Sequence, residues 1–136
     1  MKTEYQSITA FITKDGSLIR ELMHPATHKN TKQSLAQAII PVNTRTQLHR
    51  HMHSEELYHI TSGQGRMTLA DEMFTVSVAD TVCILPGTAH CIENIGDEDL
   101  VILCCCSPSY SHDDTELLEE LFSQKRQHPI HSKNAE

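Results

Sequence analysis

Short apolar runs that end at turn signals recur through the middle of the chain, and this rhythm limits the fold more than any other feature of the sequence. Residues 74–78 (FTVSV) alternate strictly between apolar and polar side chains, and the run at 81–85 stops at Pro86 and Gly87. A glycine-rich turn at 62–65 joins two more such runs in the manner of a β-hairpin. Strands at about 8 to 12 residue spacing are typical of antiparallel sandwiches and barrels. The sequence therefore predicts an all-β fold.

One short C-terminal α-helix is predicted, at residues 111–123. Asp113 and Glu116 have the spacing of a capping box. The apolar residues that follow have helical spacing and form a stripe for packing against a sheet: Leu117, Leu118, Leu121 and Phe122. Residues 124–136 have no such stripe, so we expect them to form a loosely held tail.

Length and apolar content predict a single domain over residues 1–136, with its β core at about 34–108. The chain has 136 residues, 38% of them apolar, which suffices for one buried core and is too short for two. Its longest apolar run, at 100–106, is far shorter than the ~20 residues of a membrane-spanning helix, and the first residues do not resemble a signal peptide. We therefore expect a cytoplasmic protein that does not enter a membrane.

Charge and cysteine usage exclude several classes of function. The formal net charge is −7 with only 11 Lys and Arg residues, which argues against binding to nucleic acid or to an anionic membrane. Three of the five cysteines are consecutive, Cys104, Cys105 and Cys106, in an apolar segment, and none has the C-x-x-C spacing of a thiolate metal site. We expect reduced thiols that pack in the core, with a redox or catalytic thiol as the alternative.

Residues 49–56 read HRHMHSEE, and this stretch is the first candidate for a site. Alternate residues of a strand share one face and lie roughly 7 Å apart, so His49, His51 and His53 can project from the same side. A turn and a returning strand at 57–61 can bring a glutamate back toward the histidines. The chain contains 10 histidines, so this spacing needs independent support before it counts as a motif.

That support comes from a second stretch, in which a Pro-Gly turn precedes an isolated histidine at 85–90 (LPGTAH). Together the two stretches resemble the two-motif signature of the cupin superfamily, over about residues 34–108. The matching pattern is His49-x-His51-x4-Glu56-x6-Gly63 followed by Gly87-x2-His90-x3-Asn94. The chain departs from the family pattern at Asn43 and Ala79, where glycine is usual, and at Leu85, where proline is usual. These departures concern loop shape more than metal binding.

The resemblance implies a double-stranded β-helix, a jelly-roll barrel around a ligand-sized cavity, and metal ligands at His49, His51, Glu56 and His90. Such a donor set suits one divalent transition ion per chain, Fe, Mn, Ni, Zn or Cu, and leaves two octahedral positions open. His53 and Glu55 are alternative ligands, for which solvent or supporting roles are the competing interpretation. Among residues of the right strand parity, Gln47 and Tyr58 are candidates to line the cavity, and Tyr58 is the candidate catalytic residue.

The implied function is that of a metal-dependent enzyme of the oxygenase or isomerase type. A divalent ion with one glutamate has a local charge near +1, which favours a small, oxygen-rich ligand that is anionic or enolisable. The alternative is a non-catalytic cupin that binds or senses a metal and a small molecule. Because open β-sheets leave unpaired edges, we also expect a homodimer, for which the apolar residues 8–12 are a candidate exchanged arm.

Overall fold

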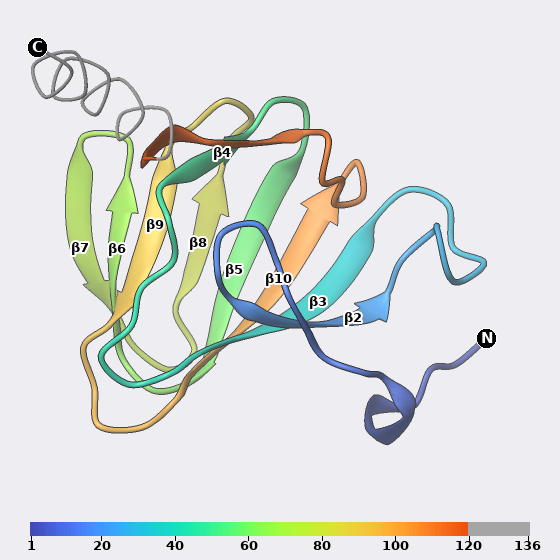
Figure 1. Ribbon diagram of the computed structural model, residues 1–136, viewed down its shortest axis with the longest axis horizontal. Helices are drawn as coiled ribbons and strands as arrows, with labels where there is room; N and C mark the ends of the chain where they lie inside the picture. The colour runs from blue at the N-terminus through green and yellow to red at the C-terminus, as the bar shows by residue number, and fades with distance from the viewer. Residues whose placement is uncertain (120–136) are drawn as a thin grey trace, which may run out of the picture.

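The computed structural model describes residues 1–119, which form two antiparallel β-sheets facing each other (Figure 1). The six-stranded sheet has the order β1-β2-β3-β10-β5-β8, and the five-stranded sheet has the order β11-β4-β9-β6-β7. A 3-10 helix, η1 (Tyr5–Ser7), precedes the first strand. The strands are β1 (Phe11–Ile12), β2 (Leu18–Met23), β3 (Ser34–Ile40), β4 (His49–His51), β5 (Glu55–Ser62), β6 (Gly65–Leu69), β7 (Glu72–Val76), β8 (Thr81–Ile84), β9 (His90–Asn94), β10 (Leu100–Ser107) and β11 (Thr115–Leu117).

The core lies between the two sheets and follows from the alternation of side chains along the strands. In β3, β5 and β10, every second residue is buried and the residues between them are partly or fully exposed. The largest fully buried apolar side chains come from both sheets: Ile60, Met67, Ile84, Ile92, Leu100 and Ile102. The prediction of an all-β jelly roll is therefore confirmed.

Two of the departures from the cupin pattern have a common backbone conformation. Asn43 has a φ of 64° and Ala79 a φ of 76°, both in the left-handed region that glycine adopts without strain. Asparagine tolerates this region better than most residues, whereas alanine is disfavoured there by about 1 to 2 kcal/mol. The loops keep the backbone shape that glycine favours, although the glycines are absent.

The C-terminal helix prediction is wrong for residues 115–117, which form strand β11 along the edge of β4 (Figure 1). Thr115 pairs with His51, and the Glu116 carboxylate accepts hydrogen bonds from Arg50 at 2.9 and 2.8 Å instead of capping a helix. The unpaired edge of β4 offers backbone partners that outweigh the local helical signals. Residues 111–114 form a turn instead of a helix, and residues 118 and 119 are helical; residues 120–123 of the prediction and the predicted tail lie outside the described residues. No helix within residues 1–119 is long and apolar enough to cross a membrane.

Candidate metal centre

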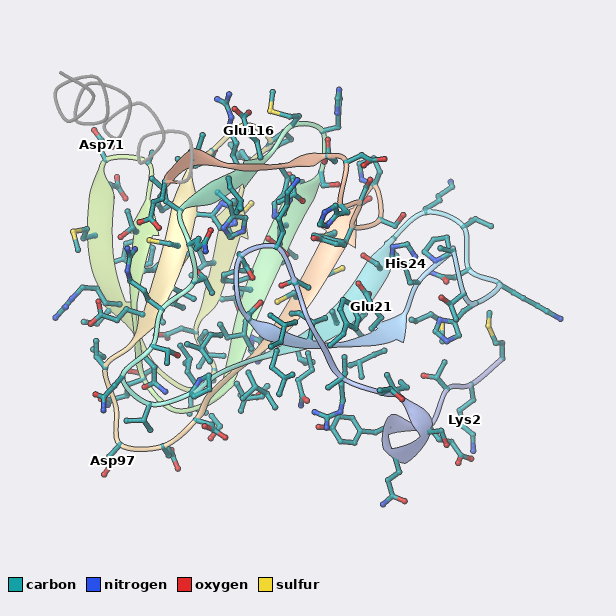
Figure 2. The ribbon with its side chains drawn as sticks, in the orientation of Figure 1. Lys2, Glu21, His24, Asp71, Asp97 and Glu116 are labelled. Carbon is teal, nitrogen blue, oxygen red and sulfur yellow. The ribbon has the colours of Figure 1, made fainter. Side chains whose placement is uncertain are left out.

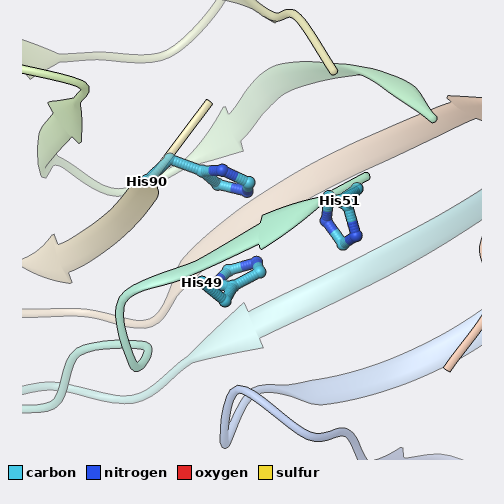
Figure 3. A group of neighbouring side chains, drawn as sticks. All are labelled: His49, His51 and His90. Carbon is cyan, nitrogen blue, oxygen red and sulfur yellow. The ribbon is translucent and has the colours of Figure 1, made fainter. Parts of the chain in front are cut away.

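Three imidazoles meet in the space between the sheets (Figure 3). His49 and His51 are alternate residues of β4 and both are buried, and His90 begins β9 directly opposite His49 in the register of the two strands. The ring centroids of His49 and His90 are 4.2 Å apart, and His51 lies 5.2 and 5.4 Å from them. Each ring offers one nitrogen, and these nitrogens all lie within 4.8 Å of one another, so the cluster can hold a metal ion.

The turn before His90 is attached to the strand that carries the other two histidines. The Gly87 backbone N–H donates a hydrogen bond to the His51 carbonyl at 2.7 Å. Gly87 has a φ of +79°, which a larger residue adopts only with strain. The Pro-Gly turn thus fixes the start of β9 against the end of β4.

Each imidazole is oriented by a hydrogen bond at Nδ1. His49 Nδ1 donates to the Gln47 carbonyl at 2.7 Å, and His90 Nδ1 donates to the Thr88 carbonyl at 2.9 Å. His51 Nδ1 lies 3.0 Å from Thr115 Oγ1, whose own proton is donated to the Ser111 carbonyl. Because Nδ1 carries the proton in all three rings, Nε2 keeps a lone pair, which is the form that binds a metal.

Glu56 brings a carboxylate to two of these nitrogens. Its Oε1 lies 3.2 Å from His51 Nε2 and 3.5 Å from His90 Nε2. Both Glu56 Oε1 and His90 Nε2 are buried and make no hydrogen bond. Buried polar atoms rarely lack a partner, and a cation among the four side chains would satisfy both atoms. The donor set therefore fits the divalent ion that the sequence motif implies.

The ionisation of these groups also suits a cation. Burial, followed by repulsion from His90, lowers the pKa of His49 to about 4, so this ring is neutral at physiological pH. Burial raises the pKa of Glu56, but this pKa stays below its usual value because the His51 and His90 rings, when they carry a proton at Nε2, outweigh burial; a bound cation would take the place of those protons. A neutral imidazole beside an ionised carboxylate is the protonation state that a divalent ion requires.

The cavity above this cluster contains polar groups that the sequence analysis missed. Asp15 and Glu21 line it, and neither occurs in a motif of recognisable spacing (Figure 2 labels Glu21). In the sequence, Asp15 is followed by Gly16 and indicates only an ordinary turn. Its position next to His49 is visible only in the structure. The remaining polar or sulfur-containing side chains in the lining include Tyr58, Cys104, Cys106, Tyr110 and Thr115. Among residues 1–119, no lysine or arginine lines this cavity.

The surface holds the other residues considered for the site. The His53 side chain is 85% exposed and its Nδ1 lies 2.7 Å from Asp114 Oδ1. Glu55 is exposed on the outer side of β5. Gln47, a candidate for the lining, is exposed as well and contributes only its carbonyl, because the chain has not yet entered β4 at that point.

The three consecutive cysteines of β10 alternate between the core and the outer face of the sheet, as expected for a strand. All five cysteines are free thiols; Cys104 and Cys106 are buried, whereas Cys105 is partly exposed. Burial raises the pKa of the Cys104 and Cys106 thiols above their usual value, with a further contribution from Glu56. Cys106 Sγ donates to Glu56 Oε2 at 3.2 Å. A protonated thiol is a weak nucleophile, so packing and this hydrogen bond describe these residues better than redox chemistry.

Comparison with known proteins agrees with the fold and with the motifs. An uncharacterized protein of Methanocaldococcus jannaschii is 58% identical over 119 residues, covering 88% of this chain and 95% of the relative. A predicted oxalate decarboxylase from Thermotoga maritima superposes with a TM-score of 0.70 at 24% identity, covering 79% of this chain and 99% of that one.

The oxalate decarboxylase of Lactobacillus farciminis, in a formate complex, superposes with a TM-score of 0.74 at 21% identity, covering 88% of this chain and 36% of that one. At these identities the two solved structures show a shared fold. The family model for the cupin domain matches residues 36–106, which contain all four candidate metal ligands. The chain therefore belongs to the cupin domain family.

Proposed function

We propose that this protein binds one divalent transition ion through His49, His51, Glu56 and His90, and is a metal-dependent enzyme. Its substrate is a small, oxygen-rich molecule that is anionic or enolisable, and its reaction is of the isomerase or oxygenase type. The observation that carries the proposal is the buried pair of atoms without hydrogen bonds, Glu56 Oε1 and His90 Nε2, 3.5 Å apart between the sheets. A bound ion would polarise a carbonyl or hydroxyl oxygen of the substrate.

Two groups in the lining are suited to hold the substrate and to exchange a proton with it. Burial raises the pKa of Tyr58 well above its usual value, so its phenol stays protonated and can donate a hydrogen bond to the substrate. Burial also raises the pKa of Glu21, whose Oε2 is buried without a hydrogen bond. A carboxyl group with a raised pKa exchanges protons more readily near neutral pH. Tyr58 would hold the substrate by a hydrogen bond, and Glu21 would exchange the proton.

The test of the metal site is elemental analysis of the protein purified without added metal. We expect about one divalent ion per chain, and loss of most of it in His49→Ala and His90→Ala. The exposed His59 offers a matched control, since His59→Ala removes an imidazole from the outer side of β5. Full metal content in His49→Ala and His90→Ala, or loss of the same amount in His59→Ala, would refute the assignment of ligands.

Turnover separates an enzyme from a protein that only binds its ligand. The metal-loaded protein is incubated with a panel of small hydroxy-ketones, hydroxy-acids and catechols, and both product formation and the shift of the melting temperature are recorded. An enzyme yields product that Tyr58→Phe reduces without changing the metal content. Ligand-dependent stabilisation without product from any compound would favour the binding or sensing alternative.

We also propose that the protein is a homodimer. Phe11 and Ile12 form the exposed edge strand β1, and Leu35 and Leu57 are 38% and 40% exposed on the outer face of the six-stranded sheet. An open edge strand and exposed apolar side chains on the outer face of the same sheet favour contact with a second copy. Light scattering at micromolar concentration should give twice the mass of the chain, and the mass of one chain would refute this proposal.

A further inference from the structure

We propose that Asp15 determines which chemical group can bind beside the metal: it accepts a hydrogen bond from a substrate hydroxyl and repels a carboxylate. The inference rests on the proposed metal site and narrows the substrate to a neutral molecule with a hydroxyl group, such as a hydroxy-ketone. Asp15 lies outside residues 36–106, which match the family model, and belongs to neither histidine motif.

Asp15 is held in one orientation by the turn that joins β1 to β2. Its Oδ1 accepts three hydrogen bonds, from Thr13 Oγ1 at 2.8 Å, from the Ser17 N–H at 3.0 Å and from Ser17 Oγ at 2.6 Å. Its Oδ2 faces the cluster, 3.5 Å from His49 Nε2, and the side chain is only 13% exposed. One oxygen therefore fixes the carboxylate, and the other is presented to whatever binds next to His49.

The turn is itself fastened to both sides of the site. The Gln47 N–H donates to the Asp15 carbonyl at 2.8 Å, just before β4 begins. Lys14 Nζ donates to the Thr115 carbonyl at 2.9 Å, on the strand that orients His51. In Figure 1 this turn is the blue loop between β1 and β2. Because the loop is tied at two points, Asp15 cannot move aside for an anion without breaking these bonds.

Charge in the cavity points in the same direction. A divalent ion with Glu56 leaves a local charge near +1, which by itself would attract an anion, but the Asp15 carboxylate cancels it. Glu21 adds a third carboxyl group to the lining, and within residues 1–119 no lysine or arginine faces the cavity to offset it. A second anion placed within a few ångströms of Asp15 would be repelled, whereas a hydroxyl would gain a charge-assisted hydrogen bond.

The size of the cavity favours a small ligand. The volume that the centre of a water molecule can occupy is about 40 Å³, which corresponds to about three waters. Hydroxyacetone and oxalate are chelators of similar size that fit this limit. Hydroxyacetone is neutral and carries a hydroxyl, whereas oxalate is a dianion without one. Comparing their affinities therefore tests the effect of charge and of the hydroxyl group at similar ligand size.

The experiment measures binding of both compounds to the Co(II)-loaded protein by the change in its visible spectrum. Asp15→Asn keeps the Oδ1 acceptor of the turn and removes the charge, and Glu21→Gln is the matched control, since it removes a cavity carboxyl that is not in contact with His49. We expect Asp15→Asn to tighten oxalate binding about tenfold or more and to weaken hydroxyacetone binding. Glu21→Gln should change the ratio of the oxalate and hydroxyacetone affinities less than threefold, because a more distant charge has a weaker effect on the bound ligand.

Three results would overturn the inference, and they differ in what else they refute. Oxalate affinity that changes less than threefold in Asp15→Asn, with normal cobalt uptake, refutes the role of Asp15 alone. An equal effect of Glu21→Gln shows that the overall field, and not Asp15, selects the ligand. A wild-type protein that takes up no cobalt refutes the metal site itself and this inference with it. Circular dichroism and the melting temperature confirm that both variants are folded before binding is measured.

Discussion

Replacing Thr115 with valine removes the hydrogen-bond acceptor of the His51 ring while nearly preserving side-chain volume. Thr115 is 4% exposed, and its hydroxyl lies 3.0 Å from His51 Nδ1 and donates to the Ser111 carbonyl. In the variant the His51 N–H is buried without an acceptor, which costs about 1 to 3 kcal/mol of unfolding free energy. The ring also loses its fixed orientation, and the loss of such a partner typically weakens metal binding 10- to 100-fold, or about 1.4 to 2.7 kcal/mol.

Two measurements on the same protein check this prediction. Urea unfolding of the metal-free protein gives the change in stability, and competition with a chromogenic chelator gives the change in the dissociation constant for Zn²⁺. Thr81→Val is the matched control, because Thr81 Oγ1 lies 2.8 Å from the Nδ1 of His59 on the surface. Water replaces that partner, so the control should change stability by less than about 0.5 kcal/mol. Equal zinc affinity in the two variants would contradict the claim that Thr115 orients a metal-binding ring.

Three further perturbations test the ionisation of His49 and the backbone of two turns. The pKa of His49 is about 4 in the folded protein and near 6.5 in the unfolded chain. The unfolding free energy of the metal-free protein should therefore be highest above pH 6.5 and fall by at most about 3 kcal/mol as the pH drops toward 4. Urea unfolding of the wild type and of His49→Gln should show different slopes of this free energy against pH. In Gly63→Ala the new Cβ would meet the Asp99 carbonyl oxygen at 2.7 Å in a backbone with φ +84°, so a loss above about 2 kcal/mol is expected. Ala79→Gly should have the opposite sign and stabilise by up to about 1 kcal/mol, since the native φ of 76° strains alanine; a loss of stability in thermal or urea unfolding would contradict this reasoning.

Most of the β core follows from local pattern, because alternation along a strand is itself the signature of burial between two sheets. Apart from Glu56, the positions of residues 55–62 and 100–107 that face the core carry apolar, tyrosine or cysteine side chains, and the turn residues between strands specify where the chain reverses. The region that becomes β11 is different. Asp113 and Glu116 have the spacing of a capping box, yet the strand forms because β4 needs a partner at its edge. Local signals could not reveal that partner, since it lies about 65 residues earlier in the sequence.

The spacing of the two motifs leads to four candidate ligands, whose metal binding stays a prediction, whereas the sequence gives no sign of the groups around them. Asp15, Glu21 and Thr115 reach the cavity through pairings between distant segments, and each is an ordinary polar residue in its own surroundings. With a divalent ion bound, Glu56 alone would leave a local charge near +1, and the Asp15 carboxylate in the lining would offset it. The identity of the metal, the single-domain organisation and the cytoplasmic location stay predictions.

The hydrogen bond from Lys14 to the Thr115 carbonyl joins an N-terminal turn to strand β11, and each of these segments contributes a residue to the cavity lining, Asp15 and Thr115. The histidines reside on the middle strands, but their cover is assembled from an N-terminal turn and a C-terminal strand. A fragment of residues 36–106 alone would therefore keep every candidate ligand and lose Asp15, Glu21 and Thr115 from the cavity lining.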